Sequence, residues 1–322
     1  MKAIVQDRYG SADVLELRDI EDPVAGEGEV LVRVRAAGAG PDVWHFMTGR
    51  PYVARPVIGF RGPKEPVRGW DVAGIVEAVG ANVTTLEVGD EVMGVAKGSF
   101  AELAVAKADL LVRKPARLSF EEAAAAPVSG YTALQALREA GVRAGQSVLV
   151  IGAAGGVGTN VIQIAKALGA QVTGVASTGK LELVTSLGAD DAIDYTREDF
   201  TDGSRRWDVI IDMAGRRPLR HLRRALTPKG RLVIVGGDGG GKWTGGFFRG
   251  MLRGRLVSLF VGQTLGGLTA KENQGDLSKL AELVEAGTLT PVVDRTFDLV
   301  QAADAIRYLE QGHPRGKVVV TV

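Results

Sequence analysis

A glycine-rich segment in the middle of the chain has the composition and spacing of a loop that binds phosphate groups. It reads Gly152-Ala153-Ala154-Gly155-Gly156-Val157-Gly158. An apolar run precedes it and apolar residues at helical spacing follow it, which predicts a strand, this loop and then a helix. Gly155 would let the backbone approach a pyrophosphate, and Gly158 would let helix and strand pack closely. Glycines alone would also fit a tight turn, but the flanking strand and helix favour a dinucleotide site that includes Ala153, Ala154, Gly155, Gly156, Val157 and Gly158.

The end of the next predicted strand indicates which dinucleotide this loop would bind. An NAD site normally places an acid there, which accepts hydrogen bonds from the ribose hydroxyls. Here the chain reads Val175-Ala176-Ser177-Thr178-Gly179-Lys180, with no carboxylate. Ser177 can donate a hydrogen bond to a 2′-phosphate and Lys180 can neutralise its charge, so the sequence favours NADPH. Lys180 would also fit an ordinary solvated lysine at a helix start.

Composition excludes several other classes of protein. The 322 residues contain 39 Lys and Arg against 38 Asp and Glu, so there is no net field to attract nucleic acid or an anionic membrane. The chain has no cysteine, and its histidines are far apart, so we expect no metal site. The first residues show neither a secretory signal nor a membrane span, and we expect a cytoplasmic protein. The three histidines are His45, His221 and His313.

The pattern of apolar residues changes along the chain and predicts two domains. Residues 1–117 carry short runs with strand alternation, as at Val30, Val32 and Val34, typical of a mostly antiparallel β domain. Residues 118–289 alternate apolar strands with helices, which predicts an α/β, doubly wound parallel sheet. Residues 290–322 return to strands around one helix and are expected to complete the first domain.

The sequence further predicts the individual elements of the second domain. A glycine-rich stretch over residues 238–253 contains Trp243, Phe247 and Phe248 and indicates a mobile loop over an apolar substrate, although a flexible surface segment with a small core of its own would also fit. Six parallel strands are expected at residues 148–151, 171–176, 191–193, 209–212, 232–235 and 256–261.

Several motifs together resemble the medium-chain dehydrogenase/reductase superfamily, and more narrowly its zinc-free quinone oxidoreductase branch. The resemblance covers the whole chain and implies a GroES-like β domain joined to a Rossmann domain, with the active site in the cleft between them. Besides the glycine loop, it rests on Gly69-Trp70-Asp71-Val72-Ala73-Gly74, Val88-Gly89-Asp90-Glu91-Val92, Gly130-Tyr131-Thr132-Ala133-Leu134-Gln135-Ala136-Leu137 and Arg315-Gly316-Lys317-Val318-Val319.

The resemblance also implies roles for single residues. Ser177, Lys180 and Tyr195 match positions around the 2′-phosphate, although Tyr195 would equally suit a half-buried strand end. Thr132 matches a position beside the nicotinamide half, although it would also suit a helix cap. Further cofactor positions are expected at two strand ends and in the closing segment, and they are Gly236, Phe260, Val261, Arg315 and Lys317.

The same comparison shows where this chain departs from its zinc-dependent relatives. Those relatives hold metal with an early cysteine and a His-Glu pair. This chain has Gly40 and its neighbours at the place of the cysteine and Trp70-Asp71 at the place of the His-Glu pair. Zinc-dependent alcohol oxidation is therefore not expected. Quinone reductases often carry asparagine at the position of Gly40, close to the nicotinamide ribose, so its absence bears on catalysis.

Without a metal to polarise a carbonyl, hydride transfer to a conjugated carbonyl compound needs the weakest proton donor from the site, because the negative charge spreads to a distant oxygen. The sequence thus predicts an NADPH-dependent reductase of quinones, enones or enals. Tyr52 would donate the proton or line the pocket, and lining is favoured because a phenol is a weak acid. His45 is interpreted as structural.

Two other functions stay open at this point. One is an enoyl-thioester reductase acting on an acyl carrier, for which Arg249, Arg253 and Arg255 would form a basic entrance for a phosphopantetheine phosphate, although a solvated face fits these arginines better. The other is a non-catalytic NADPH-binding sensor or structural protein, which Gly40 favours. The resemblance also implies a homodimer, because the related enzymes commonly pair the edge strands of their Rossmann sheets, and residues 256–261 would form an apolar edge strand here.

Overall fold

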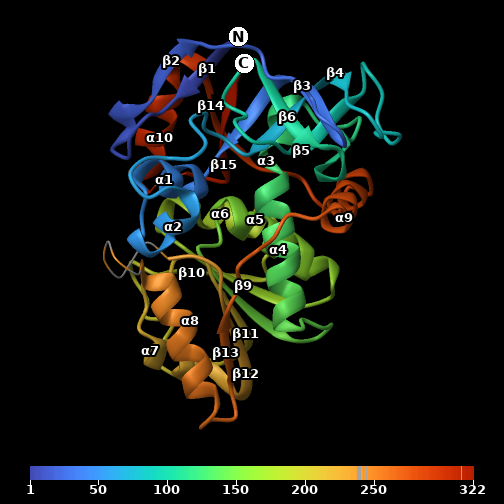
Figure 1. Cartoon of the computed structure of the whole chain (residues 1–322). Helices are drawn as coiled ribbons and strands as arrows, with labels where there is room; N and C mark the ends of the chain where they lie inside the picture. The colour runs from blue at the N-terminus through green and yellow to red at the C-terminus, as the bar shows by residue number, and fades with distance from the viewer. Residues whose placement is uncertain (238–240, 242, 244, 313) are drawn as a thin grey trace. The chain divides into compact units, whose positions relative to one another are not determined.

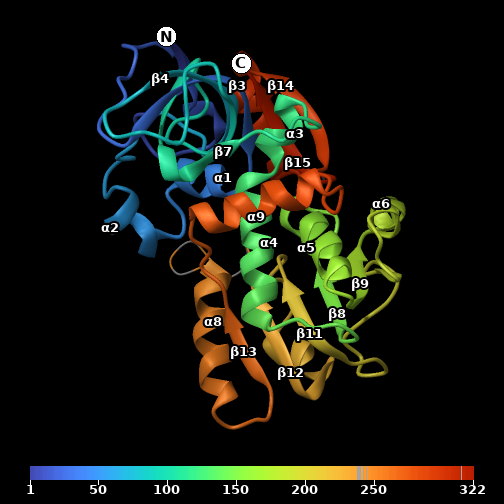
Figure 2. The ribbon, with the colours of Figure 1, turned by 90° about the vertical axis from the view of Figure 1, so that its right-hand side faces the viewer.

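The computed structural model describes residues 1–237, 241, 243, 245–312 and 314–322, so that His313 lies outside it. The chain divides into two compact units. Unit 1 comprises Met1–Tyr131 and Glu272–Val322, and unit 2 comprises Thr132–Lys271. They are coloured along the chain in Figures 1 and 2.

Unit 1 is built on an antiparallel-rich sheet. Within the described residues, seven strands form this sheet in the order β14-β15-β3-β4-β5-β7, with β6 paired to β3, and β1 and β2 form a separate hairpin. The strands are β1 (Lys2–Val5), β2 (Glu16–Asp19), β3 (Glu29–Ala39), β4 (Asp71–Val79), β5 (Glu91–Val95), β6 (Leu103–Lys107), β7 (Leu111–Arg113), β14 (Val293–Asp298) and β15 (Lys317–Thr321). The helices are η1 (Ala12–Val14), α1 (Pro41–Thr48), η2 (Tyr52–Ala54), α2 (Arg55–Ile58), η3 (Ala108–Leu110), α3 (Phe120–Ala125), α9 (Gln274–Glu285), η5 (Leu299–Gln301) and α10 (Ala302–Glu310).

The strand alternation predicted for unit 1 is confirmed in β3. Val30, Val32 and Val34 all point into the core with at most 2% of their surface exposed. Successive strand residues point to opposite faces, so one face of β3 is apolar and packs inward. The returning C-terminal segment completes this sheet, as expected, because β15 pairs antiparallel with β3.

Unit 2 is a parallel sheet covered by helices. The described residues form six strands in the order β10-β9-β8-β11-β12-β13, all paired in parallel. This order is that of a doubly wound dinucleotide-binding sheet. Successive strands are added toward one edge from β8 to β10 and toward the other edge from β11 to β13, so the strand order reverses between β8 and β11. The strands are β8 (Ser147–Ile151), β9 (Gln171–Ala176), β10 (Asp191–Asp194), β11 (Trp207–Asp212), β12 (Leu226–Ile234) and β13 (Thr264–Gly267). The helices are α5 (Gly156–Ala167), η4 (Thr178–Lys180), α6 (Leu181–Ser186), α7 (Leu219–Arg224) and α8 (Gly245–Ser258), while α4 (Pro127–Ala140) contains the division between the units.

Five of the six strand positions predicted for unit 2 are confirmed, and the sixth is wrong. Residues 256–258 are the last turn of α8, and the edge strand is β13. The mobile loop expected over residues 238–253 is also wrong from Gly245 onward, where α8 begins, and residues 238–240, 242 and 244 lie outside the description. Gly254 lets α8 lie close to β13, because a Cβ atom there would be 3.3 Å from the backbone of Leu265. Figures 1 and 2 both show α8 and β13 side by side.

The boundaries between the two units lie after Tyr131 and Lys271, whereas the sequence pattern predicts them after residues 117 and 289. Helix α9 packs on β7, and Arg117 donates a hydrogen bond to the carbonyl of Val284, so residues 272–289 belong to unit 1. Among the described residues, no helix is long and apolar enough to cross a membrane.

Candidate functional site: a dinucleotide loop and a buried charged cluster

The glycine loop lies where the sequence places it, between β8 and α5. Gly152 follows the strand with a φ of +83°, a conformation that favours glycine, and Gly155 is the N-cap of α5. Gly155 has no side chain to cap this helix, so the first N–H groups and the positive end of the helix dipole can interact with a ligand. The loop leaves the sheet beside the reversal point between β8 and β11, where doubly wound sheets bind their ligands.

Two glycines of this loop are needed for different reasons. A Cβ atom at Gly158 would lie 2.2 Å from the carbonyl oxygen of Gly152, so only glycine lets helix and loop approach this closely. At Gly155 the nearest atom to an added Cβ is 3.5 Å away, and its φ of −86° is ordinary for any residue. Nothing within the described chain therefore requires glycine at 155. A phosphate that approaches the backbone would require it, so the loop fits a dinucleotide.

The residues expected around a 2′-phosphate lie together at the carboxyl ends of β9 and β10. Ser177 is the N-cap of η4, which ends at Lys180. The N–H of Tyr195 donates to the carbonyl of Ala176 across the two strand ends at 3.1 Å, and the Tyr195 side chain is 48% exposed. The structure therefore brings Ser177, Lys180 and Tyr195 to one edge of the sheet.

This edge also carries an acid that the sequence analysis missed. Asp194 ends β10 directly opposite Ala176, the last residue of β9. Its carboxylate accepts hydrogen bonds from the Thr178 hydroxyl and, at 2.7 Å, from the Thr196 hydroxyl. The hydrogen bond from Thr178 is the largest cause that lowers the pKa of Asp194, followed by the bond from Thr196. The carboxylate is thus ionised and turned toward the chain's own donors, with Arg197 3.7 Å away.

Gly236 and Thr132 are the remaining predicted cofactor positions in this part of unit 2. Gly236 follows β12, and a Cβ atom there would lie 2.8 Å from the carbonyl oxygen of Met213, which follows β11. Asp212 ties down the loop after β11 by accepting hydrogen bonds from the N–H groups of Ala214 and Gly215, and burial raises the pKa of Asp212. These loops therefore stand at the carboxyl end of the sheet with the glycine loop. Thr132 lies in α4 and is 8% exposed.

Phe260 and Val261 were expected at a strand end beside the nicotinamide, and the structure corrects this placement. They follow the last turn of α8 and precede β13, whose first residue Thr264 pairs with Arg231. They therefore lie at the amino end of the parallel strands, whereas the glycine loop lies at the carboxyl end. Phe260 is 86% exposed.

A second group of polar residues lies in unit 1, where three neighbouring strands begin or end. Asp71 begins β4, Lys317 begins β15, and Gly40 follows the end of β3. Because β3 runs antiparallel to both neighbours, these three positions meet at one end of the sheet. The ammonium of Lys317 lies 2.6 Å from Oδ2 of Asp71, and the side chains are only 5% and 0% exposed.

This buried ion pair is joined by further charges. Oδ1 of Asp71 accepts a hydrogen bond of 2.7 Å from the N–H of Val128, in the first turn of α4. Burial raises the pKa of Asp71 in spite of the neighbouring ammonium, and the charge of Asp42 acts in the same direction. Burial acts to lower the pKa of Lys317, but the carboxylates of Asp71 and Asp42 outweigh it, so this pKa is raised. Lys317, expected to reach the cofactor, is thus held in an internal ion pair.

Tyr52, His45 and Arg315 are the other predicted residues of unit 1. Tyr52 forms part of η2, and the guanidinium of Arg55 lies over its ring, 4.4 Å from the centroid. His45 contacts the carbonyl of Arg50 through Nδ1 at 3.0 Å, which fits the structural role expected of it. Arg315 is exposed.

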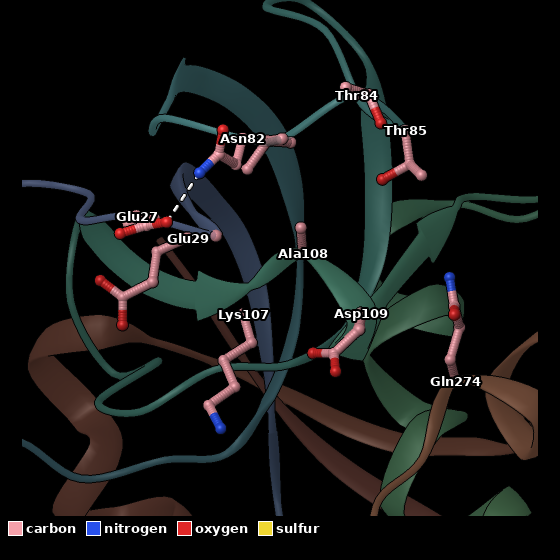
Figure 3. Close-up of a pocket in the computed structure, with 11 residues that line it drawn as sticks. Glu27, Glu29, Asn82, Thr84, Thr85, Lys107, Ala108, Asp109 and Gln274 are labelled. Carbon is pink, nitrogen blue, oxygen red and sulfur yellow. Dashed lines mark hydrogen bonds between the residues drawn. The ribbon is translucent and has the colours of Figure 1, made fainter.

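Unit 1 also has an open hollow of about 450 Å³, which Figure 3 shows. Glu27, Glu29 and Asp109 line it with a single cation, Lys107, and Asn82 donates a hydrogen bond to Glu27. This excess of carboxylates would repel the phosphates of a dinucleotide. The hollow contains none of the predicted site residues. Among the described residues, no group of three or more His, Asp or Glu side chains is arranged to hold a metal ion.

Comparison with known proteins agrees with this architecture. Residues 26–116 match the family model of the alcohol dehydrogenase GroES-like domain, and residues 187–320 match that of the zinc-binding dehydrogenases. The chain is 37% identical to 2-methylene-furan-3-one reductase of Solanum lycopersicum, over 99% of this chain and 79% of the relative. It is 32% identical to quinone oxidoreductase of Homo sapiens, over 99% and 97% of the two chains.

Solved structures give the same result. The quinone oxidoreductase of Coxiella burnetii is 33% identical and superposes with a TM-score of 0.88 over 100% of this chain and 99% of that one. A mycobacterial protein complexed with NADPH is 27% identical, with a TM-score of 0.85 over 100% of both chains.

Proposed function

The chain belongs to the medium-chain dehydrogenase/reductase superfamily, in its quinone oxidoreductase-like branch, and from this we propose that it reduces a quinone, enone or enal with NADPH. It is an oxidoreductase of this type. The observation that carries the proposal is Gly155, which the fold does not require and a dinucleotide does. The names of two relatives, 2-methylene-furan-3-one reductase and NADPH-dependent alkenal/one oxidoreductase, support the conjugated substrate class.

The proposed reaction needs little from the protein beyond position and a proton. When bound, NADPH supplies a hydride. As this hydride bonds to the β-carbon of the substrate, the electron pair of the C=C bond moves toward the carbonyl oxygen, and one proton completes the saturated product. Tyr52 is proposed to line the site, with solvent as the source of that proton. The position of a deuterium label in the product, transferred from labelled NADPH, tests this chemistry.

The preference for NADPH over NADH is part of the proposal. Ser177 and Lys180 stand at the end of β9, and the acid at the end of β10, Asp194, already accepts hydrogen bonds from two threonines. A 2′-phosphate would therefore meet a hydroxyl and an ammonium, while the Asp194 carboxylate already accepts hydrogen bonds from Thr178 and Thr196.

We expect NADPH to bind at least about tenfold more tightly than NADH, which is about 1.4 kcal/mol. The variant Lys180→Ala should remove most of this difference and leave the affinity for NADH nearly unchanged, because only the 2′-phosphate needs the ammonium. Fluorescence titration of both cofactors measures it, with Lys279→Ala on α9 as a surface control. An equal loss for both cofactors would show that Lys180 supports the fold rather than the phosphate.

Zinc independence is likewise a proposal. It is supported by the absence of cysteine from the sequence and by Trp70-Asp71 at the place of the His-Glu pair. The cytoplasmic location expected from the sequence also stays a proposal, which cell fractionation tests.

We propose that the protein is a homodimer in which the edges of two unit 2 sheets pair. The relevant edge is β13, and the end of α8 beside it exposes Leu256, Leu259 and Phe260. An uncovered edge strand next to exposed apolar side chains favours association. We expect twice the chain mass in light scattering at micromolar concentration, and Leu259→Asp with Phe260→Asp should yield monomers. A monomeric wild type would refute this assignment.

A further inference from the structure

Helix α8 approaches the sheet of unit 2 through glycines and turns several large apolar side chains toward solvent. Gly250 and Gly254 face the sheet, where an added Cβ atom would lie 3.1 Å and 3.3 Å from its nearest neighbour. Phe247 and Val257 pack on the core of unit 2. A surface helix normally turns its large apolar side chains toward the core. The packing of α8 on the sheet therefore does not explain the apolar side chains on its outer side.

The outward side chains form a strip along the helix. Phe248, Leu252 and Leu256 recur every four residues and are 41%, 61% and 54% exposed. Residues four apart are neighbours on a helix surface, so these three make one continuous apolar strip, which we call the α8 face. Trp243, two residues before the helix begins, is 75% exposed as well. Figure 2 shows α8 at an outer edge of unit 2. Contiguous exposed apolar side chains of this size mark an interaction surface.

Positive charge lies on both sides of the α8 face. At about 100° per residue, Arg255 is on one side of the strip, and Arg249 and Arg253 are on the other. All three arginines are exposed, and none has an ion pair or a hydrogen bond with the described part of the chain. The sequence has no acid from residue 245 to residue 270. A partner of the α8 face therefore has to bring the negative charge itself.

Helix α7 adds positive charge on the same face of the sheet. The helices α7 and α8 connect β11, β12 and β13, which follow one another in one direction, and right-handed crossovers then place both helices on one face. Arg220 and Arg224 of α7 are exposed. Residues 213–271 contain 12 Arg and Lys and a single acid, Asp238, so the net charge of +1 for the whole chain conceals a basic region. This region can attract an anionic surface that the chain as a whole would not.

A second copy of the chain fits the α8 face less well than a membrane does. Symmetrical packing of two such faces would bring the arginines of one copy against those of the other, with no acid in α7 or α8 to compensate. The homodimer proposed above uses β13 and the end of α8, and it shares only Leu256 with this face. An acidic protein would compensate the arginines, but it would also need an apolar groove for the strip. A bilayer with anionic lipids supplies both, since arginine side chains reach lipid phosphates from beside an apolar strip.

We propose that α8 binds the surface of a membrane that contains anionic lipids. The helix lies in the plane of the interface, with Phe248, Leu252 and Leu256 at the boundary between headgroups and acyl chains and the three flanking arginines on lipid phosphates. Its 14 residues extend for about 21 Å, which suits a helix that lies on a bilayer rather than one that spans it. The inference goes beyond the proposed function and is independent of it, because this contact needs neither NADPH nor a carbonyl compound.

The test is flotation of the full chain with lipid vesicles at about 0.1 M salt, without NADPH. Wild type should partition at least about tenfold more strongly onto phosphatidylcholine vesicles with one quarter phosphatidylglycerol than onto phosphatidylcholine alone. The variant with Arg249→Gln, Arg253→Gln and Arg255→Gln should bind the anionic vesicles about a hundredfold more weakly, as expected for three arginines at a charged surface. Phe248→Ser with Leu252→Ser should lose at least about tenfold, because the apolar strip no longer enters the bilayer.

Two controls separate the α8 face from charge and apolar surface in general. Arg8→Gln, Arg35→Gln and Arg143→Gln remove the same charge from exposed arginines elsewhere, and this variant should stay within about threefold of wild type. Val24→Ser with Val300→Ser removes two exposed apolar side chains of unit 1 and should also stay within about threefold. The melting temperature of every variant is measured alongside.

The result that supports the inference is a loss of vesicle binding in the α8 variants alone, at the melting temperature of wild type. Leu252→Ser by itself, at the most exposed of the three positions, replaces the double variant where Phe248→Ser lowers the melting temperature. Absence of wild-type binding to anionic vesicles would overturn the inference, as would equal losses in the α8 variants and their controls.

Two further results would assign the α8 face to another partner and overturn the inference as well. One is a change from dimer to monomer in light scattering of Leu252→Ser with unchanged vesicle binding, which would indicate a contact between copies. The other is binding of wild type to an acidic acyl carrier protein but not to vesicles, which would indicate a protein partner. None of these outcomes bears on the proposed function.

Discussion

A Gly155→Val variant is expected to keep the fold of the wild type and to bind NADPH at least about a hundredfold more weakly, a difference of about 2.7 kcal/mol. The reason is the difference between the two glycines of the loop. At Gly155 an added Cβ meets only the carbonyl oxygen of Gly152 at 3.5 Å, so the chain itself tolerates it. The side chain would instead stand where a pyrophosphate approaches the N-terminus of α5.

Isothermal calorimetry with NADPH and a thermal melt without ligand measure the two parts of this expectation. Gly275→Ala on α9 is the control, because its added Cβ would meet its nearest neighbour at an ordinary 3.4 Å and it lies outside the glycine loop. That variant should match wild type in both measurements. Wild-type affinity in Gly155→Val would mean that the loop is a structural turn and that the dinucleotide binds elsewhere.

Lys317→Met is expected to give the largest loss of stability among single substitutions in unit 1, about 3–5 kcal/mol. The substitution leaves the carboxylates of Asp71 and Asp42 without the ammonium that Asp71 contacts at 2.6 Å. An uncompensated buried charge, here that of Asp71, is far more costly than the loss of a surface ion pair. Urea unfolding should show the loss as a lower midpoint with an unchanged slope.

Arg315→Met is the control for Lys317→Met, because it removes a cation two residues away that is exposed in the structure. Its effect should stay within about 0.5 kcal/mol, as for most surface substitutions. If Lys317→Met were no more destabilising than this control, the ion pair would not be a fixed part of the folded state.

Much of the fold was predictable, because its signals are local. Val30, Val32 and Val34 alternate within a few residues, and the glycine loop lies next to the strand and helix that position it. The wrong strand at residues 256–261 shows the limit of such signals. Phe248, Leu252, Leu256 and Leu259 are spaced as one face of a helix, but the glycines among them indicated a loop. Gly254 is there for a tertiary reason, the close approach of α8 to β13.

The charged parts of the site were harder to predict, because their residues are distant in sequence. Nothing local links Asp71 to Lys317, and only the pairing of β15, β3 and β4 brings them together. Asp194 was not predicted for a similar reason: the acid beside Ala176 belongs to the neighbouring strand β10, whereas the usual acid of an NAD site ends the same strand as Ala176. The pattern Asp194-Tyr195-Thr196, in which an acid binds the N–H group two residues later, was the available signal.

The central claim is hydride transfer to a conjugated carbon, and the position of a deuterium label tests it most directly. The wild-type protein is given a metal chelator, an enone and NADPH deuterated at the transferred position. Mass spectrometry and NMR should find a saturated ketone with deuterium on its β-carbon, and Tyr52→Phe should slow turnover by less than about a hundredfold. Deuterium on the carbinol carbon of an allylic alcohol would contradict the account. Loss of activity in the presence of the chelator would contradict it too, as would the absence of turnover with enones, enals, quinones and enoyl thioesters.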